Sequence, residues 1–343
     1  MQLSKPPRLK TGDTIGIVAP SSGISALVPH RLQNATRYLE SQGYIVKQYP
    51  TATTKTGNSS ASPMQRANDI NDAFGDEEVK AIICNIGGFT ANQTLKYLDF
   101  DLIKDNPKIF SGYSDVSVLH YAFYSASNLT TFYGPSIMTQ FAEYPKPLAY
   151  TINHFTRAVC STEPIGRVNP SEEWTEEILD WFEKLDLQRP RRMVRNHGYE
   201  WLRHGRAEGR IIGGCLPSIL HLNGTRFWPD HAGGIMLIDI PEGHDFTKGE
   251  PLGEVESLLA DLDLNGTFSK ICGMVVGRPF RYNAVESEAL KKALIEATEP
   301  YSLPILYGAD IGHTDPVLTL PLGAKARIDS ERNAFEILES GVI

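Results

Sequence analysis

The fold is decided by Asp13-Thr-Ile-Gly-Ile-Val-Ala19, a short apolar and β-branched run between Gly12 and Pro20. Such a run predicts a buried strand. A second run of this kind, Val79-Lys-Ala-Ile-Ile-Cys-Asn85, follows two segments with helical spacing and ends in the turn Gly87-Gly88. Strands that alternate with helices in this way indicate a parallel sheet with helices on both faces.

The same alternation continues through the first 125 residues. Further strands are expected at residues 44–49 and 108–111, and a surface loop rich in Ser, Thr, Ala and Gly at residues 51–63. Helical spacing predicts four helices, at residues 27–43, 64–74, 92–98 and 116–125. We therefore assign residues 1–160 to one α/β domain.

The pattern changes after residue 160. Residues 161–205 contain Pro164, Pro170, Pro190 and several charged clusters, with little strand signal, so we interpret them as a linker with a long surface excursion that covers a substrate. Order resumes at residues 210–214. Apolar strands at 234–239 and 271–277, a helix at 255–264 and a closing strand pair at 326–338 predict a second, smaller α/β domain over residues 206–343.

Composition limits the classes of partner. The formal net charge is −8, which argues against a nucleic-acid polymer as partner, because such binders neutralise phosphates with basic groups. The four cysteines, Cys84, Cys160, Cys215 and Cys272, lie far apart and indicate free thiols. We find neither a signal-peptide segment nor an apolar run of about 18 residues, so a cytoplasmic protein without a membrane partner is expected.

A serine stands at a sharp predicted junction. In Ile109-Phe-Ser-Gly-Tyr-Ser114-Asp-Val-Ser-Val-Leu-His120 a short strand runs into Ser114, and a helix follows at once. Such a junction exposes the hydroxyl to helical N–H groups and is similar to the G-x-S-x-G elbow, with Val116 at the second glycine position. Ser114 is thus a candidate nucleophile, although a serine at a helix start is also a common N-cap.

A serine nucleophile requires a base and an orienting acid. His313 lies in a loop bounded by glycine and proline after the predicted strand Pro304–Gly308, a suitable place for a general base or simply a solvated histidine. Asp239 ends a predicted strand and Glu242 follows it; each is a candidate acid, and Asp239 could instead cap a turn.

Backbone donors for an oxyanion are also suggested. The Gly87-Gly88 turn ends a strand, so the N–H of Gly88, with the N–H of Asp115, could hold an oxyanion, unless this is an ordinary strand–helix turn. The sequence predicts no metal site and no cofactor, since it contains no H-E-x-x-H motif and Glu242-Gly-His-Asp245 is isolated. A competing possibility is a non-catalytic binding protein that holds a phosphate at Pro20–Gly23.

Several motifs together resemble one peptidase family. They are Leu9–Ser22, Gly87-Gly88, Asn106–Asp115, Arg206–Gly214, Gly312–Pro316 and Leu320–Gly323. In this order they are similar to the serine LD-carboxypeptidases of peptidase family S66. The resemblance implies an α/β fold, with an N-terminal parallel-sheet domain like those of flavodoxin or glutamine amidotransferases and a smaller C-terminal domain of the swivelling β/α/β type. It also implies Ser114 as nucleophile, His313 as base and a homodimer.

The family has two branches with different substrates. One removes D-alanine from murein tetrapeptides, and the other resembles the microcin C self-immunity proteins, which hydrolyse an aminoacyl-nucleotide antibiotic. Trp174 and Trp181 in the excursion favour the second branch, because an indole can stack on a purine, although both could simply pack on the surface. Two positions depart from the family: Asp239 replaces its usual glutamate, and Cys215 replaces an asparagine amide that would touch the substrate.

Overall fold

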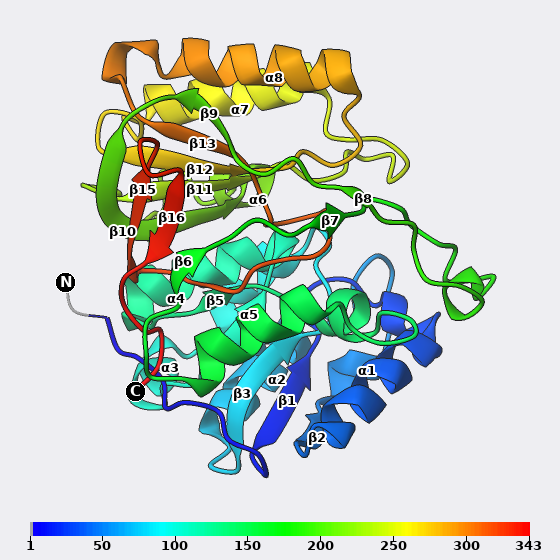
Figure 1. Cartoon of the computed structure of the whole chain (residues 1–343). Coiled ribbons are helices and arrows are strands. Elements are labelled where there is room, and N and C mark those ends of the chain that lie inside the picture. The colour runs from blue at the N-terminus through cyan, green and yellow to red at the C-terminus, as the bar shows by residue number, and fades with distance from the viewer. Residues whose placement is uncertain (1–2) are drawn as a thin grey trace.

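A parallel sheet from the first half of the chain positions the candidate serine. The computed structural model describes residues 3–343, and Figure 1 shows this sheet below a second one. Its strand order is β14-β5-β4-β3-β1-β2, and every neighbouring pair except β14 with β5 is parallel. The strands are β1 (Thr14–Val18), β2 (Ile45–Gln48), β3 (Val79–Cys84), β4 (Ile109–Gly112), β5 (Phe132–Tyr133) and β14 (Leu320–Pro321).

Helices cover both faces of this sheet because successive strand residues point to opposite sides. In β1, Ile15 and Ile17 pack with the cluster that includes α1 and α5, whereas Val18 packs with the cluster that includes α2 and α4. The α-helices are α1 (Pro29–Ser41), α2 (Pro63–Gly75), α3 (Phe100–Asp105), α4 (Ser117–Ser127) and α5 (Ala149–Cys160). Single-turn and irregular helices are η1 (Ile24–Ala26), η2 (Pro50–Thr53), η3 (Ala91–Tyr97), η4 (Ser114–Val116) and η5 (Ile137–Phe141).

The second sheet has eight strands in the order β6-β16-β15-β10-β11-β12-β13-β9. Its centre, β10 to β13, is parallel, and the strands at both edges are antiparallel. The strands are β6 (Gly166–Val168), β9 (Glu200–Arg203), β10 (Arg206–Cys215), β11 (Ile235–Asp239), β12 (Gly273–Gly277), β13 (Ile305–Ala309), β15 (Lys325–Asp329) and β16 (Ala334–Ile337). The predicted α/β architecture of two domains is confirmed.

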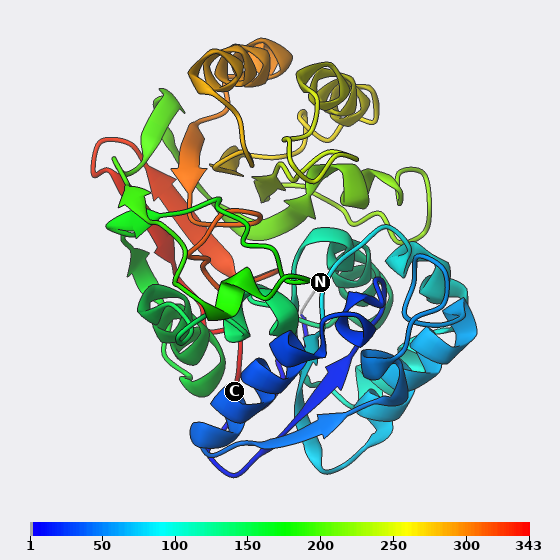
Figure 2. The same cartoon turned by 90° about the vertical axis from the view of Figure 1, so that its right-hand side faces the viewer.

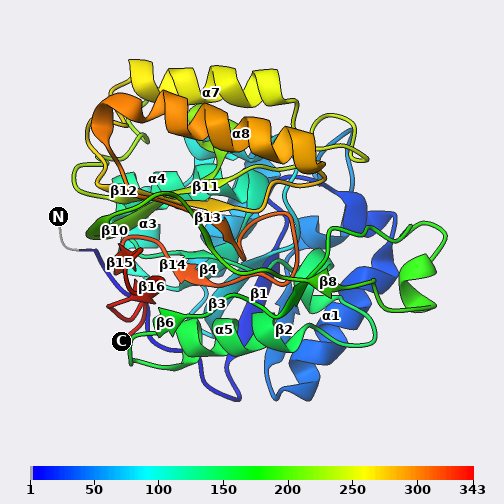
Figure 3. The same cartoon turned by 45° about the horizontal axis from the view of Figure 1, so that its top comes forward.

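Three helices and a short turn complete this part. They are α6 (Leu216–Leu220), α7 (Leu252–Leu264), α8 (Ala284–Ala297) and η7 (Glu299–Tyr301). Figures 2 and 3 show α7 and α8 side by side as an outer layer on the second sheet, on the side away from the first sheet. Asn283 starts α8 with a capping box, since its side chain accepts from the N–H of Glu286 while the Glu286 carboxylate accepts from the Asn283 N–H.

The segment 161–205 contains more strand than its sequence indicates. Strands β6 and β9 add to opposite edges of the second sheet, while β7 (Glu173–Trp174) and β8 (Val194–Arg195) form a separate two-stranded ribbon with η6 (Leu185–Leu187) between them. The prediction of little strand there was therefore wrong. Edge strands of two to four residues are too short and too polar to show an apolar alternation.

The two sheets are joined by the chain as well as by packing. After β13 the chain returns to the first sheet, where Leu320 and Pro321 of β14 pair with β5, before it re-enters the second sheet at β15. This path brings the loop after β13 to the carboxyl ends of β3 and β4. Among residues 3–343, no helix is both long enough and apolar enough to cross a membrane.

Candidate active site

Ser114 lies at the carboxyl end of β4, on a turn held in an uncommon backbone conformation. Its φ is +63°, in the left-handed region that a non-glycine residue rarely adopts, and η4 and α4 follow at once. Gly87 lies against it, since a Cβ on Gly87 would be 2.8 Å from Ser114 Oγ. The turn thus presents the hydroxyl to the predicted glycine turn, as a nucleophile elbow does.

His313 reaches Ser114 from the second half of the chain. Its Nε2 lies 2.9 Å from Ser114 Oγ, although 199 positions separate the two residues. The ring is nearly buried, with 6 % of its side chain exposed, and the ring of Tyr113 meets it edge-on at 5.1 Å between centroids. Gly312 precedes it with a φ of +84°, a conformation that favours glycine.

The two candidate acids lie near different nitrogens of the imidazole. Asp239 Oδ2 is 2.8 Å from His313 Nδ1 and also accepts a 2.6 Å hydrogen bond from Tyr133 Oη. Glu242 Oε2 is 3.6 Å from His313 Nε2, and 24 % of the Glu242 side chain is exposed. The 2.8 Å between Nδ1 and Oδ2 suits a hydrogen bond, but the angle between the two groups does not meet hydrogen-bond geometry. Hydrogen bonds of catalytic sites are often poorly aligned before substrate binds.

These carboxylates control the charge of His313. Burial alone lowers its pKa, but Asp239 and Glu242 outweigh it and raise the pKa of His313 to about 9. Burial, with Asp239 beside it, also raises the pKa of Tyr133 well above its usual range, so Tyr133 stays a protonated donor to Asp239.

The Asp115 carboxylate binds residues that lie next to the Gly87-Gly88 turn. The buried Asp115 carboxylate accepts a 2.5 Å hydrogen bond from Ser21 Oγ and a 2.8 Å bond from the N–H of Ala91. Gly88 has a φ of +149° and packs against Ser21. Gly87, rather than Gly88, is the residue in closest approach to Ser114, and a Cβ on Gly87 would lie 3.3 Å from the Asp115 nitrogen.

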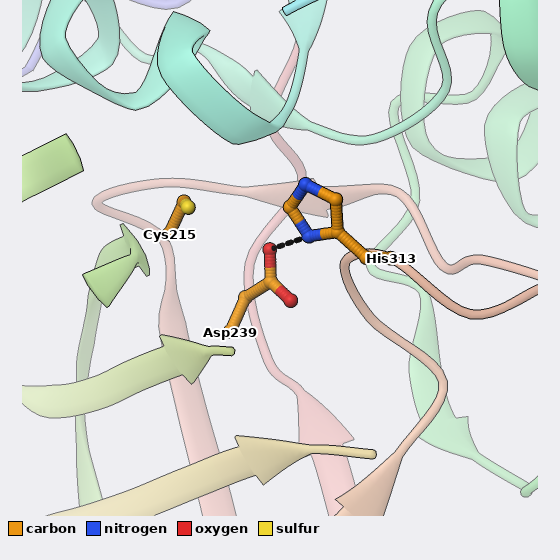
Figure 4. Close-up of side chains that lie close together, drawn as sticks. All are labelled: Cys215, Asp239 and His313. Carbon is orange, nitrogen blue, oxygen red and sulfur yellow. Dashed lines mark ion pairs between the residues drawn. The ribbon is translucent and has the colours of Figure 1, made fainter. Parts of the chain in front are cut away.

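Cys215 ends β10 beside Asp239, its register partner on β11. The thiol is buried, and Cys215 Sγ, one carboxylate oxygen of Asp239 and one ring nitrogen of His313 all lie within 4.8 Å of one another (Figure 4). Burial raises the pKa of the Cys215 thiol well above its usual range. The structure therefore places Cys215 at the site as a neutral thiol.

Trp174 and Trp181 of the excursion stack on arginines of the chain. The Arg278 guanidinium lies 5.1 Å from the Trp174 ring centroid, and that of Arg31 lies 4.5 Å from the Trp181 ring. Trp174 is nevertheless linked to the site, because the next residue, Thr175, exchanges two backbone hydrogen bonds with Asp315.

Three supporting residues were not predicted. Tyr133 and Tyr113 flank the Asp239–His313 pair, and a Cβ on Gly312 would overlap the Asp239 carboxylate. Local periodicity contains no signal for the two tyrosines, because their partners are distant in sequence. A glycine directly before the candidate base was the available signal for Gly312.

Family models match both halves of the chain. The LD-carboxypeptidase N-terminal domain matches residues 15–134, and the LD-carboxypeptidase C-terminal domain matches residues 208–328. The putative carboxypeptidase YocD of Bacillus subtilis is 36 % identical over 327 residues, 94 % of this chain and 95 % of that protein. The microcin C7 self-immunity protein MccF of Escherichia coli is 30 % identical over 334 residues, 96 % and 94 % of the two chains.

Other relatives extend the comparison. A probable murein peptide carboxypeptidase of B. subtilis is 29 % identical over 342 residues, 98 % of this chain and 95 % of that protein. The solved structure of unliganded MccF superposes with a TM-score of 0.91 at 28 % identity, over 99 % of this chain and 100 % of that one, and MccF has also been solved with aspartyl sulfamoyl adenosine. Since both family domains match in order along one chain with this fold, the protein belongs to the LD-carboxypeptidase family of peptidases, family S66.

Proposed function

We propose that the protein is a serine hydrolase that cleaves an amide bond in an aminoacyl- or peptidyl-nucleotide antibiotic. The observation that carries the proposal is the continuous line from Ser114 Oγ to His313 Nε2, at 2.9 Å, and from His313 Nδ1 to Asp239 Oδ2, at 2.8 Å. A hydroxyl, an imidazole and a carboxylate in this order form a nucleophile, a base and the group that orients the base.

The proposed reaction proceeds through an acyl-enzyme. Ser114 Oγ attacks the carbonyl carbon while His313 Nε2 takes its proton, and Asp239 stabilises the imidazolium that forms. The backbone N–H groups of Gly88 and Asp115 stabilise the oxyanion, with Gly87 leaving room beside Ser114. His313 then gives its proton to the leaving nitrogen, and water, activated by the same imidazole, releases the acyl group and restores Ser114.

The orienting acid is Asp239 rather than Glu242. Asp239 is fully buried beside Nδ1 and is fixed by Tyr133, whereas Glu242 lies on the Nε2 side, where the proton is exchanged. Asp239 compensates for its shorter side chain because Gly312 lets the loop backbone approach its carboxylate.

The preference for a nucleotide rests on likeness to MccF and on the excursion at residues 161–205. Trp174 and Trp181 carry half-buried rings on this segment, and an indole that stacks on a base contributes about 1–3 kcal/mol. Cys215 is the third proposed substrate-binding side chain, beside the two tryptophans. Unlike the asparagine of the family, it has no amide that could hydrogen-bond a polar group of the substrate.

A second candidate function is removal of D-alanine from a murein tetrapeptide. Its support is the likeness to the probable murein peptide carboxypeptidase of B. subtilis over nearly the whole of both chains. The same Ser114, His313 and Asp239 would perform either reaction, so only the leaving group differs.

For both functions the proposal includes a cytoplasmic homodimer. Sedimentation velocity would test the dimer by measuring the mass of the protein in solution.

One experiment separates these functions. The purified protein is incubated with aspartyl sulfamoyl adenosine or with a murein tetrapeptide, and mass spectrometry identifies the released fragment. We expect release of the sulfamoyl adenosine and little D-alanine, and the reverse result would favour the second function. The Ser114→Ala variant should lose about 10⁴-fold or more in kcat, while Ser41→Ala, a change at an exposed serine, should leave it unaltered. Full activity of Ser114→Ala would contradict the mechanism.

A fluorophosphonate probe tests the chemistry without a known substrate. We expect the probe to label Ser114 in the native protein and the labelling rate to fall sharply in His313→Gln, because the base is then missing. A non-catalytic binding protein would show no such labelling.

A further inference from the structure

Three side chains at the carboxyl edge of the second sheet have the chemistry of a metal site. They are Cys215 at the end of β10, Asp239 at the end of β11 and His313 after β13. Their ligand atoms lie within 4.8 Å of one another, and Figure 4 shows the Asp239 carboxylate between the thiol and the imidazole. Thiolate, imidazole and carboxylate are the three ligand types that proteins use for zinc.

Two buried atoms of this group lack aligned hydrogen-bond partners among the described residues. They are Asp239 Oδ1, and His313 Nδ1, whose 2.8 Å contact with Asp239 Oδ2 is an ion pair without hydrogen-bond alignment. A buried polar atom without a partner is unfavourable, and it is uncommon in native proteins. Since Asp239 is fully buried and His313 nearly so, a bound cation would satisfy groups that solvent cannot reach easily.

The distances suit a small ion after a slight adjustment. Tetrahedral zinc bonds of about 2.0 to 2.3 Å hold two ligand atoms about 3.3 to 3.5 Å apart. His313 Nδ1 and Asp239 Oδ2, now 2.8 Å apart, must therefore separate slightly, and the Cys215 sulfur, which lies within 4.8 Å of the other two ligand atoms, must approach them. Cys215 occupies the last position of a strand in register with Asp239, so a rotation about its Cα–Cβ bond moves the sulfur without moving the sheet.

We propose that Cys215, Asp239 and His313 bind a thiophilic divalent cation, Zn²⁺ or Cd²⁺, and that the bound ion inhibits the hydrolase. The binding depends only on these three side chains, whereas the inhibition rests on the proposed function. Mg²⁺ and Ca²⁺ do not bind, because both prefer oxygen ligands.

Inhibition follows from the proton positions. The ion takes the lone pair of His313 Nδ1, so the neutral imidazole must carry its proton on Nε2. That N–H then points to Ser114 Oγ, 2.9 Å away, and the imidazole can no longer accept the serine proton. The Cys215 thiol loses its proton to solvent as the sulfur–metal bond forms, and a charged His313 imidazole also loses its Nδ1 proton, so each ion releases one or two protons and no electron is transferred.

The test uses Cd²⁺, whose bond to a thiolate produces an ultraviolet charge-transfer absorption. The metal-free protein is titrated with Cd²⁺, and we expect one ion per chain with this absorption. Cys215→Ser should lose the absorption and weaken binding by about 10- to 100-fold or more, the loss seen even when a supporting group of a metal site is removed. Cys160→Ser is the matched control, because Cys160 is a free cysteine that contacts Tyr44 and is not part of the group with Asp239 and His313. This variant should bind Cd²⁺ as the native protein does.

Two further measurements keep binding and function apart. Ser114→Ala should retain the Cd²⁺ absorption, because Ser114 contacts Nε2 and not Nδ1, even though its hydrolysis is lost. In the native protein Zn²⁺ should slow fluorophosphonate labelling of Ser114 reversibly, and excess chelator should restore it; in Cys215→Ser, at least tenfold more Zn²⁺ should be needed for the same fractional inhibition. No thiolate absorption in the native protein, or an equal one in Cys215→Ser, would overturn the proposal whatever the substrate proves to be.

Discussion

At the scale of single residues, the site depends on how a few side chains share one imidazole. His313 contacts Ser114 through Nε2 and Asp239 through Nδ1, and Glu242 adds a second carboxylate 3.6 Å from Nε2. The carboxylates stabilise the imidazolium, which would help the proposed proton transfer, but they also keep the imidazole charged at neutral pH.

The rise of kcat/KM with pH should therefore extend to an unusually high pH. A general base acts in its neutral form, so kcat/KM should rise with pH until the pKa of His313, about 9, is passed. In Glu242→Gln the rise should shift to lower pH, because one stabilising carboxylate is lost. A pH–rate profile of both proteins checks this, and an unchanged rise in Glu242→Gln would contradict the role of Glu242.

The same pKa predicts a pH effect on stability. The pKa of His313 is raised on folding from the usual value near 6.5 to about 9, so its contribution is complete below about pH 6.5 and is lost as the pH rises through 9. Urea unfolding at several pH values should show a smaller decline between pH 6.5 and 9 in His313→Gln than in the native protein. Equal declines would mean that other groups cause it.

Gly312 should tolerate no side chain. In Gly312→Ala the new Cβ would overlap the Asp239 carboxylate, and the left-handed backbone adds about 1–3 kcal/mol of strain. We expect a fall of at least tenfold in kcat together with a lower free energy of unfolding, measured by urea denaturation. Gly253→Ala is the matched control, because a Cβ there, in helix α7, meets open space. Its kcat should be nearly unchanged, and its free energy of unfolding should not fall, since alanine favours a helix more than glycine does.

At the scale of elements, the excursion 161–205 is anchored to the loop that carries His313. Asp310, just after β13, accepts hydrogen bonds from the Ser171 N–H and Oγ, both 2.7 Å, from Tyr150 Oη at 2.9 Å and from Arg278 at 2.5 Å. One buried carboxylate thus fixes the excursion, α5 and the base loop relative to one another.

Removal of Asp310 should be strongly destabilising. Asp310→Ala leaves the Arg278 guanidinium buried without its ion-pair partner, and we expect the free energy of unfolding to fall by about 3–5 kcal/mol. Arg332→Ala is the control, since its exposed pair with Glu336 should contribute under about 1 kcal/mol. Equal effects of the two substitutions in urea denaturation would contradict the anchoring role.

Elements differ in how well the sequence predicts them. Central strands such as β1 and β3 have apolar runs bounded by glycine or proline, so their position was predicted to within one residue at each end. The edge strands β6 and β9 were missed, since they derive their stability from backbone pairing with a neighbour and not from an apolar pattern. Likewise, Ser114 was identified as a candidate from a local turn. The hydrogen bond from Tyr133 to Asp239 was not predicted, because the two residues lie 106 positions apart.

At the scale of the whole molecule, the two sheets share their cores. One buried cluster contains Val18 of the first sheet and Met236 of the second, and another contains Ile15 and Leu237. The chain also crosses back through β14 to pair with β5. The halves that carry Ser114 and His313 are therefore expected to unfold together.

A single cooperative transition is the resulting prediction. All four tryptophans lie beyond residue 173, and Trp181 and Trp228 contact Arg31 and Tyr121 of the first half. Their fluorescence therefore reports the second half and its contacts with the first, whereas far-ultraviolet circular dichroism reports the secondary structure of both halves. The two signals should give coincident urea transitions with one midpoint. Separate midpoints would show that the halves unfold independently.

Periodicity, glycine placement and turn chemistry act over a few residues, so the sequence predicts the alternation of strands and helices, the family motifs and the candidate serine, histidine and acids. The tertiary structure alone decided which acid lies beside which nitrogen, and that Cys215 joins Asp239 and His313. These distances depend on strand register in the second sheet and on how the two sheets pack. Both arise from contacts between residues that lie from 24 positions apart, as Cys215 and Asp239 do, to 199 positions apart, as Ser114 and His313 do, where no local pattern acts.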